Sequence, residues 1–203
     1  SLLERGKRVL DHSADFRFTD VSVYEKWYKV VHPAPHLIPK AVYGLPELYR
    51  DRIKSAELVA DPGCYPTCSV LGIAPVLKNK MISSKNIIID AASGVSGAGR
   101  KAELAYTLCE QSENFKAYGI TSHRHTPEIE QELSLLAGEQ VLISFTPHLL
   151  PMKRGMLATS YLNLLDDSLN TDKIHDFYKE YYKNETFVRI LPKGIHPETK
   201  NVA

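Results

Sequence analysis

The sequence has few of the features that mark secreted, metal-binding or nucleic-acid-binding proteins. Its 203 residues include 3 cysteines and 1 tryptophan, and 25 Lys and Arg side chains are balanced by 24 Asp and Glu, which leaves a net charge of +1. Cysteines this few, and odd in number, do not build the disulfide framework of a small secreted domain. The balanced charge provides no basic excess, so no nucleic-acid partner is expected.

Long apolar runs are also missing. No stretch of about 20 apolar residues occurs, so the sequence predicts no membrane-spanning helix. The first residues, Ser1-Leu2-Leu3-Glu4-Arg5, lack the apolar run of a signal peptide. Cys64 and Cys68 have no second nearby pair of ligands, so no zinc site is expected. Together these absences predict a cytoplasmic protein that binds neither a membrane nor a metal.

The composition that remains is that of a globular protein, with 43% hydrophobic and 24% charged residues. Segments typical of strands and helices alternate in the first part of the chain, and strands become more frequent later. This order predicts an α/β portion joined to an α+β portion. Strands are expected at residues 7–11, 58–60, 86–92, 140–146 and 157–164, and helices at residues 20–30, 66–77, 101–111 and 172–182 and from residue 126 onward.

The most informative segment is Asp61-Pro62-Gly63-Cys64-Tyr65-Pro66-Thr67, which places a thiol where a strand ends and a helix begins. Unpaired N–H groups and the positive end of the helix dipole lower the pKa of a thiol at such a position and favour the thiolate. Cys64 is therefore a candidate nucleophile, although a free cysteine is often a small buried apolar residue instead. Cys68 and Cys109 fall inside expected helices, and we expect both to be structural.

A second segment, Ser122-His123-Arg124-His125-Thr126-Pro127-Glu128, offers the proton-transfer partner that a nucleophilic thiol needs. His123 and His125 stand just before an expected helix, which Thr126 would cap and whose dipole Glu128 would face. Two imidazoles that flank an arginine, Arg124, beside a helix start indicate a site that handles an anion. Surface or capping histidines and a zinc-binding pair are the alternatives, and no nearby cysteine or carboxylate completes a zinc site.

A glycine-rich segment, Gly97-Ala98-Gly99-Arg100-Lys101-Ala102, matches the G-x-G-x-x-G/A dinucleotide-binding pattern after an expected strand. The acidic residue that should end a second strand about 20 positions later falls in an expected helix instead. A glycine-rich wall that lets a cofactor or substrate approach the backbone is therefore the favoured interpretation. Arg100 and Lys101 would then be either solvated or in contact with a phosphate.

Arg17 and Arg154 are candidates for binding an anionic substrate. Arg17 follows a strand end, where α/β sheets place ligand-binding loops. Arg154 lies in a turn bounded by proline and glycine. Most loop arginines are solvated or form weak surface ion pairs, so a binding role requires bidentate contact with a phosphate or a carboxylate.

Six segments carry a resemblance to a known family. They lie at residues 13–17, 43–47, 62–67, 93–99, 123–129 and 147–152 and read SADFR, YGLPE, PGCYPT, SGVSGAG, HRHTPEI and PHLLPM. In this order they resemble the N-acetyl-γ-glutamyl-phosphate reductase family, whose fold is related to that of aspartate-semialdehyde dehydrogenase. The resemblance runs over essentially the whole chain.

The resemblance implies roles for individual residues. It implies that Cys64 is the nucleophile, that His123 or His125 is the acid/base group, and that Arg17 holds the substrate phosphate. It also implies that the loop at Ser96 and Gly97 lies against the nicotinamide half of NADP(H).

The resemblance also implies a fold. The remnant of a Rossmann-type dinucleotide-binding domain is expected over residues 1–62. A catalytic and oligomerisation domain with a mixed, mostly antiparallel sheet is expected over residues 63–203. The family begins with a strand and a G-x-x-G-Y-x-G loop for the NADP phosphates and ends with a segment that returns to the nucleotide domain; this sequence has neither. We therefore expect a central fragment that is inactive by itself.

One departure from the family concerns Asp61, where the family usually has Asn. An ionised carboxylate close to Cys64 would oppose thiolate formation. A carboxylate turned away from the thiol would instead cap the following helix. The second arrangement is the one we expect.

The implied activity is the NADPH-dependent reduction of N-acetyl-γ-glutamyl 5-phosphate to the 5-semialdehyde and phosphate, through a thioester on Cys64, in arginine biosynthesis. One alternative is the same chemistry on an aminoadipyl or aspartyl phosphate. Others are a cofactor-independent cysteine hydrolase and a non-enzymatic oligomerisation module. The implied partners are a small acyl phosphate, NADP(H) and further copies of the chain in a homodimer or homotetramer.

Overall fold

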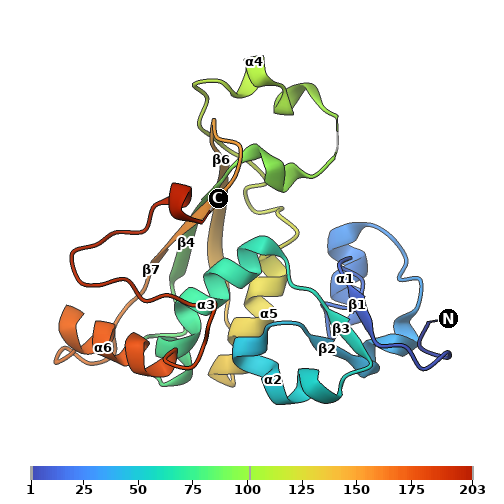
Figure 1. The fold of residues 1–203 in the computed structure, drawn as a ribbon, viewed down its shortest axis with the longest axis horizontal. Helices are drawn as coiled ribbons and strands as arrows, with labels where there is room; N and C mark the ends of the chain where they lie inside the picture. The colour runs from blue at the N-terminus through green and yellow to red at the C-terminus, as the bar shows by residue number, and fades with distance from the viewer. Residues whose placement is uncertain (1, 101, 203) are drawn as a thin grey trace.

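The computed structural model of the chain describes residues 2–100 and 102–202. A small sheet lies at the right of Figure 1, a larger sheet rises from the centre, and helices α3 and α5 lie in the middle. In chain order the strands and α-helices are β1 (Val9–Asp11), α1 (Val21–Tyr28), β2 (Ala41–Tyr43), α2 (Pro46–Ser55), β3 (Leu58–Ala60), α3 (Cys64–Lys78), β4 (Ile87–Ser93), α4 (Leu108–Gln111), β5 (Lys116–Ala117), α5 (Thr126–Ala137), β6 (Ile143–Leu149), β7 (Met156–Tyr161) and α6 (Thr171–Tyr181).

The small sheet is parallel, with the strand order β1-β3-β2. Because parallel strands end at the same edge, the loops that follow all three strands meet there, and ligand sites form at such edges. The backbone N–H of Gly44 donates to the carbonyl of Ala60 across 2.8 Å. A Cβ at Gly44 would lie 2.8 Å from the same carbonyl oxygen, so this close approach of β2 and β3 requires glycine.

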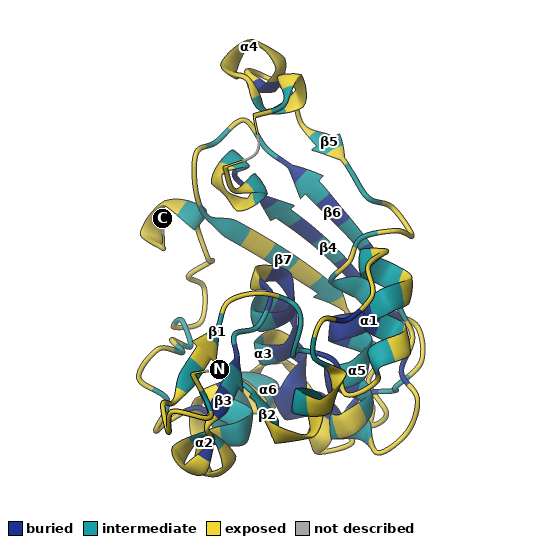
Figure 2. Cartoon of the chain, turned by 90° about the vertical axis from the view of Figure 1, so that its right-hand side faces the viewer, coloured by how far each residue is buried: buried dark blue, intermediate teal, exposed yellow. Residues whose placement is uncertain are grey.

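The larger sheet is mixed, with the strand order β5-β6-β4-β7. β4 runs parallel to β6 and antiparallel to β7, and β5 runs antiparallel to β6. Ile87, Ile89 and Ala91 of β4 are buried toward the helices, whereas Ile88 points to the opposite face and is 42% exposed. Figure 2 shows the four strands side by side, with intermediate and exposed residues alternating along β7. The expected combination of an α/β portion with a mixed sheet is confirmed.

The core lies between the larger sheet and the pair α3 and α5, which pack against each other. Val70, Ile73 and Ala74 of α3 and Ile129 and Leu133 of α5 are fully buried there. Such a core stabilises the domain by removing apolar surface from water. α6 lies outside this pair and is attached to α3 through its tyrosine hydroxyl groups, which donate to carbonyls of α3.

Several expected boundaries were wrong. α3 begins at Cys64 rather than Pro66, and α5 begins at Thr126, so His125 and not Thr126 is its N-cap residue. The helix expected over residues 101–111 is not continuous, because Thr107 is extended between a 3₁₀ turn at Leu104–Tyr106 and the short helix α4; Lys101 lies outside the described residues. β6 continues past Pro147, whose carbonyl accepts from the N–H of Tyr118.

No helix in the described residues is long and apolar enough to cross a bilayer.

Truncating the core tests this arrangement. Leu133 of α5 is 0% exposed and Leu135 of the same helix is 58% exposed. Leu133→Ala should lower the free energy of unfolding by about 2–5 kcal/mol, because it removes buried methyl groups and leaves a cavity. Leu135→Ala is the matched control and should change it by about 0.5 kcal/mol or less. Urea denaturation of both variants measures the difference, and equal losses would contradict the packing described.

Candidate active site

Cys64 is the first residue of α3, directly after the turn that follows β3. The backbone N–H groups of Cys64 and Tyr65 both reach the sulfur, as expected at a helix N-terminus. The residue is exposed and lines two neighbouring cavities. The sequence therefore placed this thiol correctly, at an accessible point between a strand and a helix.

The expected low pKa of this thiol is wrong. Burial of the sulfur within the site raises the pKa of Cys64, and the N–H groups of Tyr65 and Cys64 and the guanidinium of Arg17 reduce that rise without reversing it. The negative charge of Glu128 acts in the same direction as burial. Because desolvation outweighs the helix N-terminus, the thiol is neutral at neutral pH in the absence of a ligand.

The histidine pair lies beside this turn. A Cβ added to Gly63 would lie 2.6 Å from Nε2 of His125, so the imidazole occupies the space above the glycine. His123 packs edge-on against His125 and against the ring of Tyr65, and its Nδ1 accepts from the backbone N–H of His125. A neutral His123 therefore carries its proton on Nε2. The structure thus brings Cys64, His123 and His125 to one place.

Both imidazoles are held neutral. Burial, followed by the charge of Arg124, lowers the pKa of His123 to about 4. Burial, followed by His123, Arg17 and Arg124, lowers the pKa of His125 to about 3. At neutral pH each ring can therefore accept a proton, and neither forms a standing ion pair with a thiolate.

A cavity of about 510 Å³ contains Cys64 and both histidines in its lining. Two cationic side chains, Arg124 and Lys116, line the same cavity. Arg124 belongs to the segment that the sequence predicted to handle an anion, whereas Lys116 was not among the expected site residues. Phenol groups also line it, and the hydroxyl of Tyr118 donates to that of Tyr65 across 3.1 Å. Such a lining suits a small anionic molecule that also carries hydrogen-bonding groups.

A second cavity, of about 460 Å³, also has Cys64 in its lining, together with Ser96 and Gly97. Gly97 lines both cavities, as Cys64 does. Residues Val95–Ala98 form a 3₁₀ turn, and in the described part of the chain the next α-helix is α4 at Leu108–Gln111, so the segment does not have the form of a Rossmann pyrophosphate loop. That Ser96 and Gly97 form a glycine-rich wall for a cofactor or substrate stays a prediction, and both residues line this cavity; Lys101 lies outside the described residues.

The two candidate arginines are placed differently. The side chain of Arg17 is 10% exposed, and its guanidinium donates to the carbonyls of Asp61 and His12 and contacts Glu128 at 3.5 Å. Arg154 is exposed on the loop between β6 and β7, where its backbone packs against Gly94. Arg17 is thus close to residues 61–63, the turn that precedes Cys64, which we call the cysteine turn. Arg154 borders the glycine-rich wall.

The capping role expected for Asp61 is wrong. Its carboxylate faces Nδ1 of His12 at 2.7 Å, and the N-cap position of α3 belongs to Gly63. Asp61 precedes the N-cap residue by two positions, and its carboxylate contacts the loop after β1 instead. His12 was not among the expected site residues.

Glu128 has contacts within the site that its position in the sequence did not predict. It is 0% exposed, and its Oε1 accepts from the backbone N–H of Gly63 and from the hydroxyl of Tyr43, each across 2.8 Å. Glu128 lies in the first turn of α5, as the sequence predicted, and in addition its carboxylate binds the N–H of Gly63 just before Cys64. Within residues 2–100 and 102–202, no three His, Cys, Asp or Glu side chains are grouped to hold a metal ion.

Comparison with known proteins gives one family and one set of close relatives. The family described as semialdehyde dehydrogenase, dimerisation domain, matches residues 64–203. The chain is 62% identical over 202 residues to the N-acetyl-gamma-glutamyl-phosphate reductase of Acetivibrio thermocellus, and 56% identical over 203 residues to that of Geobacter sulfurreducens. All of this chain is covered in both cases, but it spans 58% of the length of either relative.

Solved structures show the same fold. Aspartate semialdehyde dehydrogenase II from Vibrio cholerae, complexed with ASA, matches 97% of this chain and 58% of its own with a TM-score of 0.66 and 12% identity. The Candida albicans aspartate semialdehyde dehydrogenase with NADP matches 91% of this chain and 50% of its own with a TM-score of 0.56 and 11% identity. The resemblance noted in the sequence is confirmed.

Adding a methyl group at Gly63 tests the contact between the turn before Cys64 and the ring of His125. Gly63→Ala should lower the free energy of unfolding by about 1–3 kcal/mol, because the new Cβ displaces the ring of His125 from a packed position. Gly72→Ala is the matched control on the same helix, since a Cβ there meets nothing within 4 Å. It should raise stability by about 0.4–1 kcal/mol. Urea denaturation measures the free energy of unfolding of both variants. An unchanged free energy of unfolding in Gly63→Ala would contradict the contact with His125.

Proposed function

The chain belongs to the semialdehyde dehydrogenase family, and on that premise we propose that it is the central part of an NADP-dependent reductase of arginine biosynthesis. The proposed reaction converts N-acetyl-γ-glutamyl 5-phosphate to N-acetylglutamate 5-semialdehyde and phosphate. The observation that carries the proposal is the position of Cys64 between two cavities, one with two neutral imidazoles and cationic side chains and one with a glycine-rich wall.

In the first step an imidazole of the His123 and His125 pair accepts the proton of the Cys64 thiol as the sulfur attacks the acyl carbon. The carbon–sulfur bond forms, the carbon–oxygen bond to phosphate breaks, and a thioester remains on Cys64. The N–H groups of Cys64 and Tyr65, at the start of α3, are available to stabilise the charge that develops. Because thiol and imidazole start neutral, the proton moves when the substrate is in place.

The wall beside Cys64 fits the flat ring of a nicotinamide. A Cβ at Gly97 would meet only Ser93 Oγ, at 3.7 Å, and one at Gly99 would meet nothing within 4 Å, so both positions leave space against the backbone. Ser96 and Gly97 are the proposed contacts. When bound, NADPH supplies the hydride that reduces the thioester. The chain itself holds the thioester carbon at the wall, and a histidine returns the proton as the semialdehyde leaves the sulfur.

The substrate of this reaction carries a phosphate and a carboxylate. Arg17 is the proposed partner of the phosphate, with Arg154 as a second candidate at the wall. Lys116 and Arg124, which line the cavity with both histidines, can bind the carboxylate. The same chemistry on an aspartyl or aminoadipyl phosphate needs the same cations. A cofactor-independent hydrolase would leave the glycine-rich wall and its cavity without a role.

The two sheets support a division into two functional domains. We propose that residues 1–62, which contain the parallel sheet, belong to the nucleotide-binding domain, and that residues 63–203 form the catalytic and oligomerisation domain. The three cysteines are free, which fits the reducing cytoplasm proposed for this enzyme.

The outer face of the larger sheet is the proposed surface for a second copy of the chain. Ile88 pairs with Tyr161 across β4 and β7, and Leu157 lies further along the same face. Their exposed fractions are 42%, 55% and 39%. Exposed apolar side chains in register on a flat sheet are typical of an interface, and the family match is to a dimerisation domain.

Replacing the nucleophile tests the chemistry. Cys64→Ser in the complete reductase should lower kcat by at least about 10³-fold, because an alcohol is far less ionised than a thiol near neutral pH. Cys68→Ser, one helical turn later, is the matched control and should keep most of the activity. The readout is NADPH oxidation with the acyl phosphate. Full activity in Cys64→Ser would rule out the thioester route, and turnover without NADPH would favour the hydrolase.

Charging the outer sheet face tests the oligomer. Tyr161→Asp should convert the oligomer to monomers, because a buried unpaired carboxylate is costly at an apolar interface. Leu135→Asp, on the helical side of the molecule and 58% exposed, should leave the assembly unchanged. Sedimentation velocity of the two variants makes the comparison. A Tyr161→Asp protein with the wild-type sedimentation coefficient would exclude this face as the interface.

A further inference from the structure

Glu128 is a fully buried acidic residue whose partners all come from other parts of the site. Its Oε1 accepts from the Gly63 N–H and from the Tyr43 hydroxyl, and its Oε2 lies 3.5 Å from a guanidinium nitrogen of Arg17. Burying a carboxylate is costly unless hydrogen bonds compensate it. Burying the carboxylate of Glu128 costs free energy, and the carboxylate contacts the turn just before the nucleophile. We therefore expect a role of Glu128 beyond packing.

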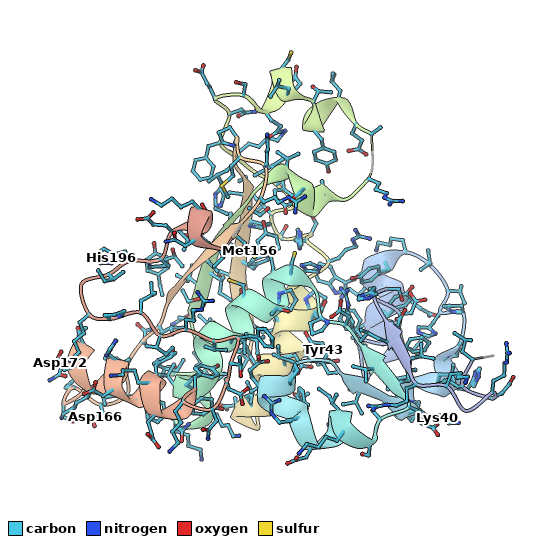
Figure 3. All side chains as sticks on the ribbon, in the orientation of Figure 1. Lys40, Tyr43, Met156, Asp166, Asp172 and His196 are labelled. Atoms are coloured by element: carbon cyan, nitrogen blue, oxygen red, sulfur yellow. The ribbon has the colours of Figure 1, made fainter. Side chains whose placement is uncertain are left out.

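The three partners belong to three separate elements. Gly63 precedes α3, Tyr43 ends β2, and Arg17 lies in the loop between β1 and α1. Glu128 itself lies in the first turn of α5, directly after the histidine pair. Figure 3 labels Tyr43, which lies where the small sheet meets the two central helices. One carboxylate, on the helix α5 that follows the histidine pair, thus connects β2 of the small sheet, the loop after β1 and the turn before Cys64.

The charge of Glu128 also fits these partners. Burial raises the pKa of this carboxyl group, and Arg17, the Gly63 N–H and the Tyr43 hydroxyl each act against that rise. The Gly63 N–H and the Arg17 guanidinium can only donate, and the Tyr43 hydroxyl donates to the same carboxyl group, so a carboxylate uses all three neighbours. The hydrogen bonds from Gly63 and Tyr43, at 2.8 Å, have the length of charge-assisted hydrogen bonds, and the one from Gly63 holds the backbone in place.

We propose that Glu128 is a positioning residue, whose buried carboxylate fixes the Gly63 N–H, and with it the turn that presents Cys64, while it holds the Arg17 guanidinium beside the same turn. The next residue after Gly63 is the nucleophile, and the ring of His125 rests on Gly63 itself. A shift of this backbone therefore moves thiol and imidazole relative to each other. The inference rests on the proposed function, because it assigns Glu128 to the alignment of that nucleophile.

Glu132 offers a matched control. It lies one turn later on α5, is 1% exposed, and its oxygens accept from the Tyr49 hydroxyl and from the Gln131 side chain. It is therefore as buried as Glu128, with a similar number of donors, but it does not touch the cysteine turn. Glu132→Gln measures what the loss of a buried charge on this helix does by itself.

The test compares Glu128→Gln, Glu128→Ala and Glu132→Gln in the complete reductase. Glu128→Gln keeps an oxygen for the Gly63 N–H, whereas Glu128→Ala removes it. A displacement of about 1 Å at reacting groups costs on the order of 10²-fold in rate. We expect Glu128→Ala to lower kcat by about 10²-fold with little change in KM, Glu128→Gln to recover most of that loss, and Glu132→Gln to keep the wild-type kcat.

A second readout needs neither substrate nor cofactor. The rate of Cys64 alkylation by iodoacetamide is followed against pH by peptide mass spectrometry. The charged or titratable groups around the sulfur are Arg17, Glu128, Tyr65, Cys68 and Tyr118. The same cavity also contains His123, His125, Arg124, Lys116 and Tyr106. Removing the negative charge in Glu128→Gln should shift the midpoint to lower pH, because that charge opposes the thiolate. Glu132→Gln should leave the midpoint unchanged.

The outcomes separate this inference from the proposed function. If Glu128→Gln and Glu132→Gln give the same alkylation profile, and Glu128→Ala keeps the kcat of Glu132→Gln, the positioning role is overturned. If Glu128→Ala does not fold, the comparison of the pH midpoints of Cys64 alkylation in Glu128→Gln and Glu132→Gln still tests the role of Glu128. A shifted midpoint in a protein that reduces no acyl phosphate would support the role of Glu128 and refute the reductase.

Discussion

The hydrogen bond from the Gly63 N–H to the carboxylate of Glu128 is the contact on which the site depends. It joins the start of α3 to the start of α5, so the thiol of Cys64 and the two imidazoles meet although they lie far apart in the sequence. Gly63 has to be glycine because the ring of His125 fills the space of a Cβ. Arg17 reaches the same carboxylate from the loop between β1 and α1, and this contact connects the small sheet to the turn before the nucleophile.

Burial sets the electrostatics of this site. It raises the pKa of Cys64 and lowers the pKa of His123 and His125 to about 4 and about 3, so thiol and imidazoles are neutral together. A neutral thiol is a poor target for oxidants, because the thiolate is the form that reacts. The proposed chemistry then requires proton transfer during the attack on the acyl carbon. The cationic lining at Lys116 and Arg124 attracts an anionic substrate without ionising the thiol beforehand.

Local sequence patterns predicted much of the fold and part of the candidate site. The β-branched run of β4, the glycine before Cys64 and the proline in the first turn of α5 specify local geometry that the structure contains. The low pKa expected for Cys64 and the cap expected from Asp61 were wrong, because both depend on neighbours from distant segments: the protein that buries the sulfur, and His12. Glu128 carried a local signal for a helix start, but its partners Gly63 and Tyr43 are known only once the sheets are assembled.

The thioester on Cys64 is the central claim, and it can be observed directly. The complete reductase is mixed with the acyl phosphate in the absence of NADPH, quenched within milliseconds, and analysed for free phosphate and for acylated peptides by mass spectrometry. The account predicts a burst of one phosphate per subunit and one acyl group on the peptide that contains Cys64. Phosphate release that requires NADPH, or an acyl group on any other residue, would contradict it.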